Sequence, residues 1–317
     1  MPSNSPSQND PSQRHNTTLF EWYITITDTE SNTTPIAVLE RYANEHNIAI
    51  SKAVLKQAVH KGALWLTPRV NKKRTQRLRR VKKQLTVGDE LHFYYNRDVL
   101  SCTVPEAKLI ADFVGYSVWY KPYGMLSQGS KWSDHCTIAR YAQQHLPVER
   151  PAFIVHRLDR AATGLILIAH TKKVAQTLSK MFELHQLEKN YYIVVHGNHQ
   201  QRPQPDTITS DIANKSASSS FTCLAYDEKS HRSLVNVSIS SGRKHQIRIH
   251  AASIGMPVVG DRFHGKADES EALNLQLCAV SLRFDCPLNQ LKQMSSDVVK
   301  DTKPMFFEVP EALKPQL

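Results

Sequence analysis

The sequence predicts a mixed α and β chain, arranged as a small basic domain followed by a larger second domain. Its length of 317 residues suggests two domains. Apolar residues recur at helical spacing in some segments, while other segments contain short apolar runs or apolar–polar alternation that favour strands. The net charge of +11 falls almost entirely in one N-terminal segment. These patterns give α and β structure but do not by themselves fix the arrangement of the strands.

The first domain is expected to follow a disordered tail. Residues 1–18 are rich in Ser, Asn, Gln and Pro and offer almost nothing to bury, so we expect disorder. The domain itself is expected to span residues 19–100 and to begin with a strand at 19–27, where Trp22, Ile24 and Ile26 alternate with polar residues.

Two helices and two short strands are expected next. Apolar residues at helical spacing predict a helix from about residue 36, and a second one that follows a possible N-cap at Ser51 and ends at Gly62. Short extended segments follow at 64–66 and 90–95.

One segment of this domain is strongly basic. Residues 36–97 contain 14 Lys and Arg and 4 Asp and Glu, a net charge of +10. A single run of charge is usually a solvated surface, but a net charge this high within one segment favours phosphate binding. Such contacts carry no base information. The densest part of the run consists of Lys72, Lys73, Arg74, Arg77, Arg79, Arg80, Lys82 and Lys83. Within it, we expect phosphate contacts from Lys72, Lys73, Arg74 and Arg77.

A linker at residues 101–113, containing Pro105, is expected to lead into the second domain at residues 114–317. This domain opens with a strand candidate at 114–120, followed by a turn at Lys121-Pro122-Tyr123-Gly124. Lys121 is either a substrate contact or a plain turn residue.

Residues 153–169, FIVHRLDRAATGLILIA, place one carboxylate in a polar cluster between two apolar runs that read as buried strands. Asp159 lies among His156, Arg157 and Arg160, and we expect it to be ionised because neighbouring cations stabilise the anion. Such a group suits nucleophilic or electrostatic work. A buried Asp–Arg ion pair is the alternative.

The chain then continues with alternating elements. Thr171 is expected to cap a helix with one apolar face, and residues 189–197, KNYYIVVHG, form a strand on which Tyr191 and Tyr192 must face opposite sides. Polar residues 200–220 predict a loop, and strands are expected at 220–226 and 233–240.

Residues 242–265, GRKHQIRIHAASIGMPVVGDRFHG, are expected to include a helix that ends before Gly255, because Ile247, Ala251 and Ile254 fit one helical face. His245 and Arg248 would lie on a common side of it.

Three of these segments, in this order, resemble signatures of the RluA-type pseudouridine synthase family: HRLDR followed by small residues and Gly164, the Lys-x-Tyr strand at 189–191, and the 242–265 stretch. The Lys-Pro entry at Lys121 and the strands at 275–287 and 305–309 resemble the entry, closing strand pair and terminal strand of the same catalytic domain. The basic domain resembles the S-four-like RNA-binding module.

The resemblance implies an α+β catalytic domain with a mixed, mostly antiparallel sheet flanked by helices and loops. It implies isomerisation of uridine to pseudouridine in ribosomal or transfer RNA, with no cofactor or metal. Asp159 would act at the ribose, Arg248 would hold it ionised through a bidentate contact, and Tyr191 would stack on uracil. The substrate-binding residues would be His156, Arg157, Arg160, Lys121, Arg243 and His245, with His156 or Arg157 supporting the flipped base.

The sequence departs from the family pattern at Ala162-Thr163, Lys244, His264, Cys278 and Cys286, which leaves the subfamily and its RNA open. Two other functions stay open: a catalytically silent RNA-binding assembly factor, and a hydrolase that releases uracil, which would normally need a second carboxylate.

The composition bears on disulfides, metal binding and the cellular compartment. The five cysteines form no CxxC pair, so neither a disulfide framework nor a zinc site is indicated. No apolar run approaches a membrane span, and no signal peptide is evident, so we expect a cytoplasmic protein that binds RNA, not membrane, as a monomer.

Overall fold

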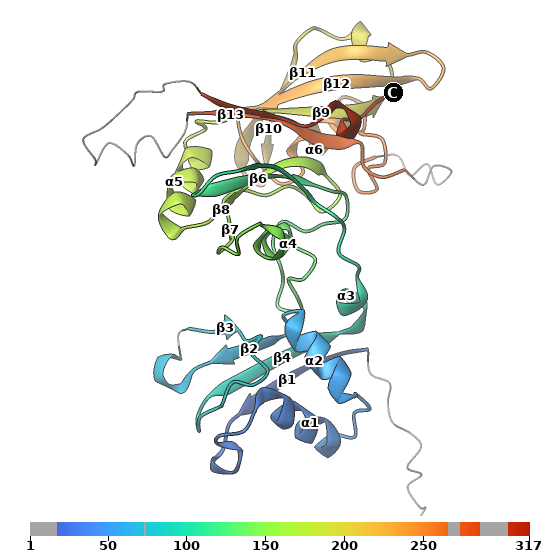
Figure 1. Cartoon of the computed structure of the whole chain (residues 1–317). Coiled ribbons are helices and arrows are strands. Elements are labelled where there is room, and N and C mark those ends of the chain that lie inside the picture. The colour runs from blue at the N-terminus through green and yellow to red at the C-terminus, as the bar shows by residue number, and fades with distance from the viewer. Residues whose placement is uncertain (1–17, 73, 266–272, 286–303) are drawn as a thin grey trace, which may run out of the picture. The chain divides into compact units, whose positions relative to one another are not determined.

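The computed structural model describes residues 18–72, 74–265, 273–285 and 304–317. It divides into two compact units (Figure 1). Unit 1 comprises the chain up to Thr103 together with Gly129–His135, and unit 2 comprises Val104–Gln128 and Cys136–Leu317. The tail expected at 1–18 lies, apart from Thr18, outside the described residues.

Unit 1 is an antiparallel sheet with two main helices. The strand order is β1-β4-β2-β3. Side chains of Thr34 and Ser51 accept hydrogen bonds from the first turns of α1 and α2, so both helices begin where a polar cap precedes an apolar run. The elements are β1 (Leu19–Thr25), α1 (Pro35–Glu45), α2 (Lys52–His60), β2 (Leu64–Thr67), β3 (Gln76–Arg77), β4 (Glu90–Asn96) and α3 (Arg97–Ser101).

One arginine of the basic run is a structural residue of unit 1. The Arg77 side chain is only 13% exposed; its Nε lies 3.3 Å from Asp134 and its guanidinium covers the Trp65 ring at 4.3 Å. It also donates to the carbonyl groups of Gly62 and Ser130. The prediction that Arg77 contacts phosphate is therefore wrong in this geometry, because each of its three guanidinium nitrogens lies against a protein group.

The other predicted phosphate contacts differ from Arg77 in their exposure. The Lys72 side chain is 71% exposed, with its ammonium 3.5 Å from Glu90, and Arg74 is exposed. Lys73 lies outside the described residues. Lys72 and Arg74 are thus the predicted phosphate contacts that the structure describes at the surface.

Unit 2 is built on a mixed, mostly antiparallel sheet, as the family resemblance implied. Its order is β10-β11-β12-β9-β13-β8-β6-β5, with β14 paired to β13 and β7 to β8. Among the paired strands of the described chain, only β13 and β8 run parallel. The strands are β5 (Lys108–Asp112), β6 (Tyr116–Lys121), β7 (Phe153–Ile154), β8 (Thr163–Ala169), β9 (Glu188–His196), β10 (Asp206–Ile212), β11 (Lys215–Asp227), β12 (Arg232–Ile239), β13 (Leu277–Phe284) and β14 (Met305–Glu308).

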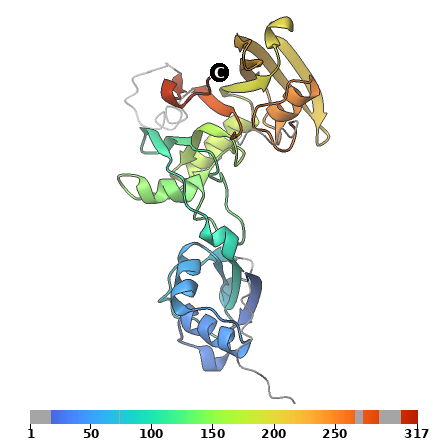
Figure 2. The same ribbon diagram turned by 90° about the vertical axis from the view of Figure 1, so that its right-hand side faces the viewer.

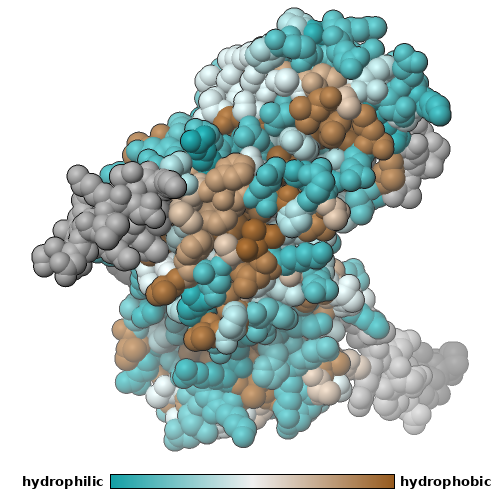
Figure 3. Space-filling view, turned by 45° about the horizontal axis from the view of Figure 1, so that its top comes forward, coloured by the Kyte–Doolittle hydropathy of each residue, from teal (hydrophilic) through white to brown (hydrophobic). Residues whose placement is uncertain are grey.

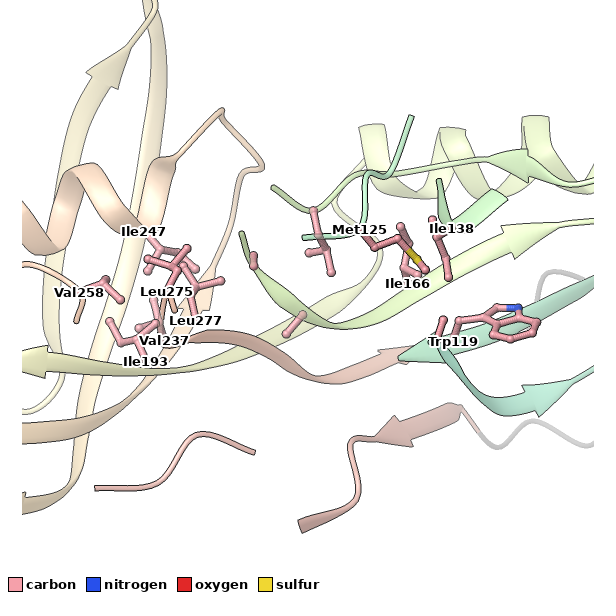
Figure 4. Close-up of a cluster of buried hydrophobic side chains, with 14 of the residues drawn as sticks. Trp119, Met125, Ile138, Ile166, Ile193, Val237, Ile247, Val258, Leu275 and Leu277 are labelled. Carbon is pink, nitrogen blue, oxygen red and sulfur yellow. The ribbon is translucent and has the colours of Figure 1, made fainter. Parts of the chain in front are cut away.

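Three helices accompany this sheet: α4 (Ile138–His145), α5 (Lys172–Glu183) and α6 (Gln246–Ser253). Thr171 caps α5 by accepting from the Val174 N–H, as predicted. α6 lies against β10 and β11, where the orange helix meets the yellow strands in Figure 2. Its residue Ile247 packs with Val237 and Leu277 in a buried apolar cluster (Figure 4). The sheet therefore fixes the helix that carries Arg248.

Two segments that were expected to lack regular structure contain β-strands. The polar 200–220 segment forms β10 and the start of β11, because Ile212 and Ala217 turn inward while Thr and Ser hydroxyls pair across the outer face, as at Thr209–Ser218. The 101–113 segment, expected as a linker, contains β5, which pairs with β6.

The expected closing strand pair at 275–287 is a single strand, β13, whose partners are β8, β9 and β14. Gly164 allows β8 to approach it: a Cβ at this position would lie 2.3 Å from the Ala279 carbonyl oxygen, and its φ of +111° is one that glycine adopts without cost. The parallel β8–β13 pairing places the HRLDR loop, which precedes β8, beside β9.

The surface is mixed in polarity. Hydrophilic and hydrophobic residues are interspersed on the face shown in Figure 3, as on most protein surfaces. Among the described residues, no helix combines the length and apolar character that crossing a membrane requires.

Candidate active site

The loop between β7 and β8 holds Asp159 at the edge of a cavity. Leu158 on one side is 9% exposed, and Ala162 is 2% exposed, so the loop is anchored in the core. Ser127 fixes it further, since its hydroxyl donates to the Leu158 carbonyl at 2.7 Å and accepts from the Leu158 N–H at 3.0 Å. The Asp159 side chain is 29% exposed and so remains accessible to a substrate.

Arg248 contacts Asp159 but is held by another acid. One guanidinium nitrogen, Nη1, donates to Asp159 Oδ2 at 3.2 Å. The bidentate pair is with Asp261, where Nε and Nη2 donate to the two carboxylate oxygens at 2.7 and 2.6 Å. The predicted contact between Arg248 and Asp159 is present, but the predicted bidentate geometry is wrong, because the planar fork is already occupied by Asp261.

Asp261 is a site residue that the sequence did not single out. It is 5% exposed and accepts two more hydrogen bonds, from the N–H groups of Phe263 and His264. Burial alone would raise the pKa of Asp261, but Arg248 and these N–H groups outweigh burial and lower it. The signal available was a lone acid in GDRFHG, close to Arg248 in the chain.

His245 gives Asp159 a second neighbour. It precedes α6, with a left-handed φ of 57°, and its Nε2 lies 3.7 Å from Asp159 Oδ2. Its Nδ1 lies 2.9 Å from His264 Nε2. Burial lowers the pKa of His245, opposed by Asp159. The two ring nitrogens of His245 thus face different partners, Nε2 the carboxylate of Asp159 and Nδ1 the ring of His264.

Strand β9 separates the two tyrosines as alternation predicted. Tyr191 packs against the core cluster on the site side and lines the cavity beside Asp159. Tyr192 packs against the cluster on the opposite side, with the Lys314 ammonium 5.7 Å from its ring. Burial and the charge of Asp159 raise the pKa of Tyr191, so its phenol stays protonated.

Two adjoining cavities surround these groups. The smaller, about 90 Å³, is lined by Asp159, Tyr191, His245 and Arg248, among others. The larger, about 890 Å³, shares Asp159 and Tyr191 and extends past Lys189 to the end of α5. Arg157 and Arg243 line both, and Arg160 lines the larger. All three arginines thus border cavity space that Asp159 also lines.

The arginines that flank Asp159 in the sequence do not neutralise it. Arg157 and Arg160 are exposed, and Arg160 Nε donates to the Gly124 carbonyl at 3.2 Å. Within the described part of the chain, the arginine in ion-pair contact with Asp159 is Arg248. Arg243 Nε donates to the Ser216 carbonyl at 3.3 Å, and the residue lines both cavities.

His156 lines the larger cavity but has a structural partner. Its Nε2 accepts from the Leu167 N–H at 2.9 Å, and its ring stacks on Phe182 at 4.2 Å. Burial, with the charge of Lys189, lowers the pKa of His156 to about 3. The imidazole is therefore neutral and ties the loop to β8, with one ring face occupied by Phe182.

Lys121 does not contact a substrate in this geometry. The side chain is fully buried, and its ammonium donates to the carbonyl groups of Pro122, Met125 and Arg160 at 3.0, 2.9 and 3.4 Å. Burial, opposed by Asp159, lowers the pKa of Lys121 to about 7. The prediction that Lys121 contacts the substrate is wrong, because its ammonium group instead connects the turn after β6 to the loop that carries Arg160.

The residues that depart from the family pattern differ in their location and burial. His264 contacts His245, whereas Cys278 is fully buried in β13, where burial raises its pKa to about 11. Cys286 lies outside the described residues. Among the residues described, no group of three or more His, Cys, Asp or Glu side chains is arranged to hold a metal ion.

Comparison with known proteins gives one consistent result. Residues 115–253 match the model of a family described as RNA pseudouridylate synthase. A Vibrio vulnificus relative named tRNA pseudouridine synthase C is 30% identical over 227 residues, which cover 61% of this chain and 92% of the relative. An Aquifex aeolicus relative, named an uncharacterized RNA pseudouridine synthase, is 28% identical over 284 residues, covering 82% of this chain and 86% of that protein.

The fold has a solved counterpart. Human RNA pseudouridylate synthase domain containing 1 superposes with a TM-score of 0.52 at 19% sequence identity, covering 66% of this chain and 85% of that one. This likeness concerns the fold.

Proposed function

Because the chain belongs to the RluA-type family of RNA pseudouridine synthases, which isomerise uridine in RNA to pseudouridine, we propose that Asp159, Arg248 and Tyr191 carry this reaction here. The observation that supports the assignment most directly is the contact of Arg248 with Asp159 inside a cavity also lined by Tyr191. The substrate is a uridine in structured RNA, either transfer or ribosomal.

The reaction rearranges bonds within one nucleotide. The bond from ribose C1′ to uracil N1 breaks, the base rotates, and a bond forms from C1′ to C5. C5 loses a proton and N1 gains one, so the product is an isomer of the substrate. Asp159 acts at the ribose, as a nucleophile at C1′ or as a base toward a ribose proton. Either role requires the ionised carboxylate, which the hydrogen bond from Arg248 stabilises.

Asp261 makes Arg248 a fixed rather than a mobile cation. Two hydrogen bonds to a buried carboxylate hold the guanidinium, and the remaining nitrogen is aimed at Asp159. This arrangement pre-organises the charge before the substrate arrives, so no reorganisation is needed during the reaction. Tyr191 offers a protonated phenol, which suits stacking and hydrogen bonding to uracil rather than service as a phenolate base.

The nucleotide must reach these groups from a folded RNA. A uridine within a stack is extruded to enter such a site, and stacking on an aromatic ring offsets part of that cost. Arg157, Arg160 and Arg243, which line the cavities, would contact the nucleotide or its neighbours. The relative named tRNA pseudouridine synthase C favours transfer RNA among the possible targets.

Unit 1 would supply affinity rather than chemistry. We assign it the role of an S-four-like RNA-binding domain, on the grounds of its net basic charge and its exposed Lys72 and Arg74. Phosphate neutralisation by such residues releases counterions and yields binding that is independent of sequence. Selection of the uridine then falls to unit 2.

One assay separates this function from the alternatives. Total RNA from cells lacking the protein is incubated with the full chain, and both pseudouridine and free uracil are measured. We expect pseudouridine without uracil. Release of uracil would indicate a hydrolase, and binding without either product would indicate a silent RNA-binding factor.

A further inference from the structure

The larger cavity contains a lysine that the catalytic assignment does not use. Lys189 lies on β9 two residues before Tyr191, so strand alternation turns both side chains to the same face of the sheet. Both line the cavity of about 890 Å³. Tyr191 faces the nucleotide, so Lys189 is directed to a neighbouring part of the same space.

The Lys189 ammonium has no acidic partner. Within the described chain, no carboxylate oxygen lies within ion-pair distance of it, and its nearest ring contact is Phe182, at 5.7 Å from Nζ. The residue is only partly exposed, and burial lowers its pKa. A partly buried cation without a counter-ion is costly, and an incoming anion would remove that cost.

The wall of this cavity is itself electropositive. Five of its lining residues are Lys or Arg, against two carboxylates, Asp159 and Glu183. His156, which also lines this cavity, is neutral and adds no charge. The Asp159 carboxylate contacts Arg248 at 3.2 Å and His245 at 3.7 Å and makes no ion pair with Lys189 in the described chain. The anion that fits beside Lys189 therefore comes from the ligand.

We propose that Lys189 binds a backbone phosphate of the RNA, adjacent to the uridine held between Asp159 and Tyr191. This inference rests on the proposed function, because it takes RNA as the molecule that fills the cavity. A lysine is suited to the task, since it meets phosphate as a flexible point charge with three donors. The contact anchors the flipped nucleotide through its backbone while Tyr191 contacts the base.

The test compares Lys189→Gln with wild type and with Lys173→Gln, a control at an exposed position of α5 that lines neither cavity. Binding of a fluorescein-labelled transfer RNA transcript is measured by anisotropy from low to high salt. Losing one phosphate contact should reduce the slope of log affinity against log salt by about one unit. Affinity at about 0.15 M salt should fall roughly tenfold, and Lys189→Arg should restore most of the slope.

Two results would overturn the proposal. One is a wild-type salt slope in folded Lys189→Gln. The other is a fall in kcat in that variant with slope and KM unchanged, which would make Lys189 a proton-transfer group. The binding slopes decide the matter even if the wild-type chain forms no pseudouridine, an outcome that would instead contradict the catalytic assignment.

Discussion

At the scale of single residues, the site is a chain of charges in which each member fixes the next. Asp261 holds Arg248, Arg248 donates to Asp159, and Asp159 is left partly exposed to the substrate. The sequence indicated the two members that line the cavity, Asp159 and Arg248, because their motifs are recognisable. It did not indicate Asp261, because a buried acid that serves only to hold an arginine has no local pattern of its own.

Asp261→Asn tests this support directly. The substitution leaves the buried Arg248 without its bidentate anion, and breaking such a pair should lower the free energy of unfolding of unit 2 by about 3 kcal/mol. Turnover should fall as well, because Arg248 is then free to swing away from Asp159. Urea unfolding at pH 7 measures the first effect. Glu188→Gln, which breaks an exposed pair with Arg283 at 3.9 Å, should change stability by less than about 0.5 kcal/mol.

His156 predicts a sensitivity to acid. Its ordinary pKa of 6.5 falls to about 3 in the folded protein, so the unfolded chain takes up a proton between these values and the folded chain does not. The free energy of unfolding should therefore fall as pH decreases from about 6.5 to 3, by about 1–2 kcal/mol from this group at pH 5. His156→Gln keeps an acceptor for the Leu167 N–H and should show a smaller loss between pH 7 and pH 5. Equal losses in both proteins would contradict this role.

At the scale of elements, apolar patterning predicted those strands and helices whose buried faces are apolar. β9 and α5 appear where their periodicity placed them, and so does α6, although His245 precedes it rather than lying on it. β10 was missed because its buried positions are few among Thr and Ser, residues equally common in loops. The pairing of β8 with β13 depends on contacts between segments more than 100 residues apart, which local patterns do not encode.

The two tyrosines of β9 test the register of this strand. Tyr191→Phe removes the phenolic hydroxyl group from the cavity but keeps the aromatic ring. We expect kcat/KM to fall by about tenfold, which corresponds to the loss of one hydrogen bond in the transition state. Tyr192→Phe alters the opposite side of the sheet and should leave kcat/KM nearly unchanged. Initial rates of pseudouridine formation measure both. The reverse pattern would place Tyr192, not Tyr191, in the site.

At the scale of the whole molecule, the densest positive charge and the proposed chemistry lie in different units. Residues 36–97, with a net charge of +10, belong to unit 1, whereas Asp159, Tyr191 and Arg248 belong to unit 2. Composition revealed this division, but it did not reveal which basic residues are free. Arg77 and Lys72 are both basic residues of the same run. Only the fold shows that the Arg77 guanidinium already contacts Asp134 and Trp65.

The Lys72→Gln, Arg74→Gln double variant tests the proposed role of unit 1. If each side chain contacts one phosphate, the slope of log affinity against log salt should become shallower by about two units. The apparent KM should rise while turnover at saturating RNA persists. Arg77→Gln serves as the contrast: it should lower the melting temperature of unit 1, because Asp134 loses one of its two arginine partners. An unchanged slope in the double variant would show that this surface is merely solvated.

The measurement that bears most directly on the catalytic assignment is pseudouridine formation by Asp159→Asn. The amide keeps the size of the side chain but cannot act as an anion at the ribose, and it remains able to accept the hydrogen bond from Arg248. We expect no pseudouridine after exhaustive incubation with total RNA, together with RNA affinity close to that of the wild type. Pseudouridine formed by Asp159→Asn at a measurable rate would contradict the assignment of Asp159 as the catalytic carboxylate.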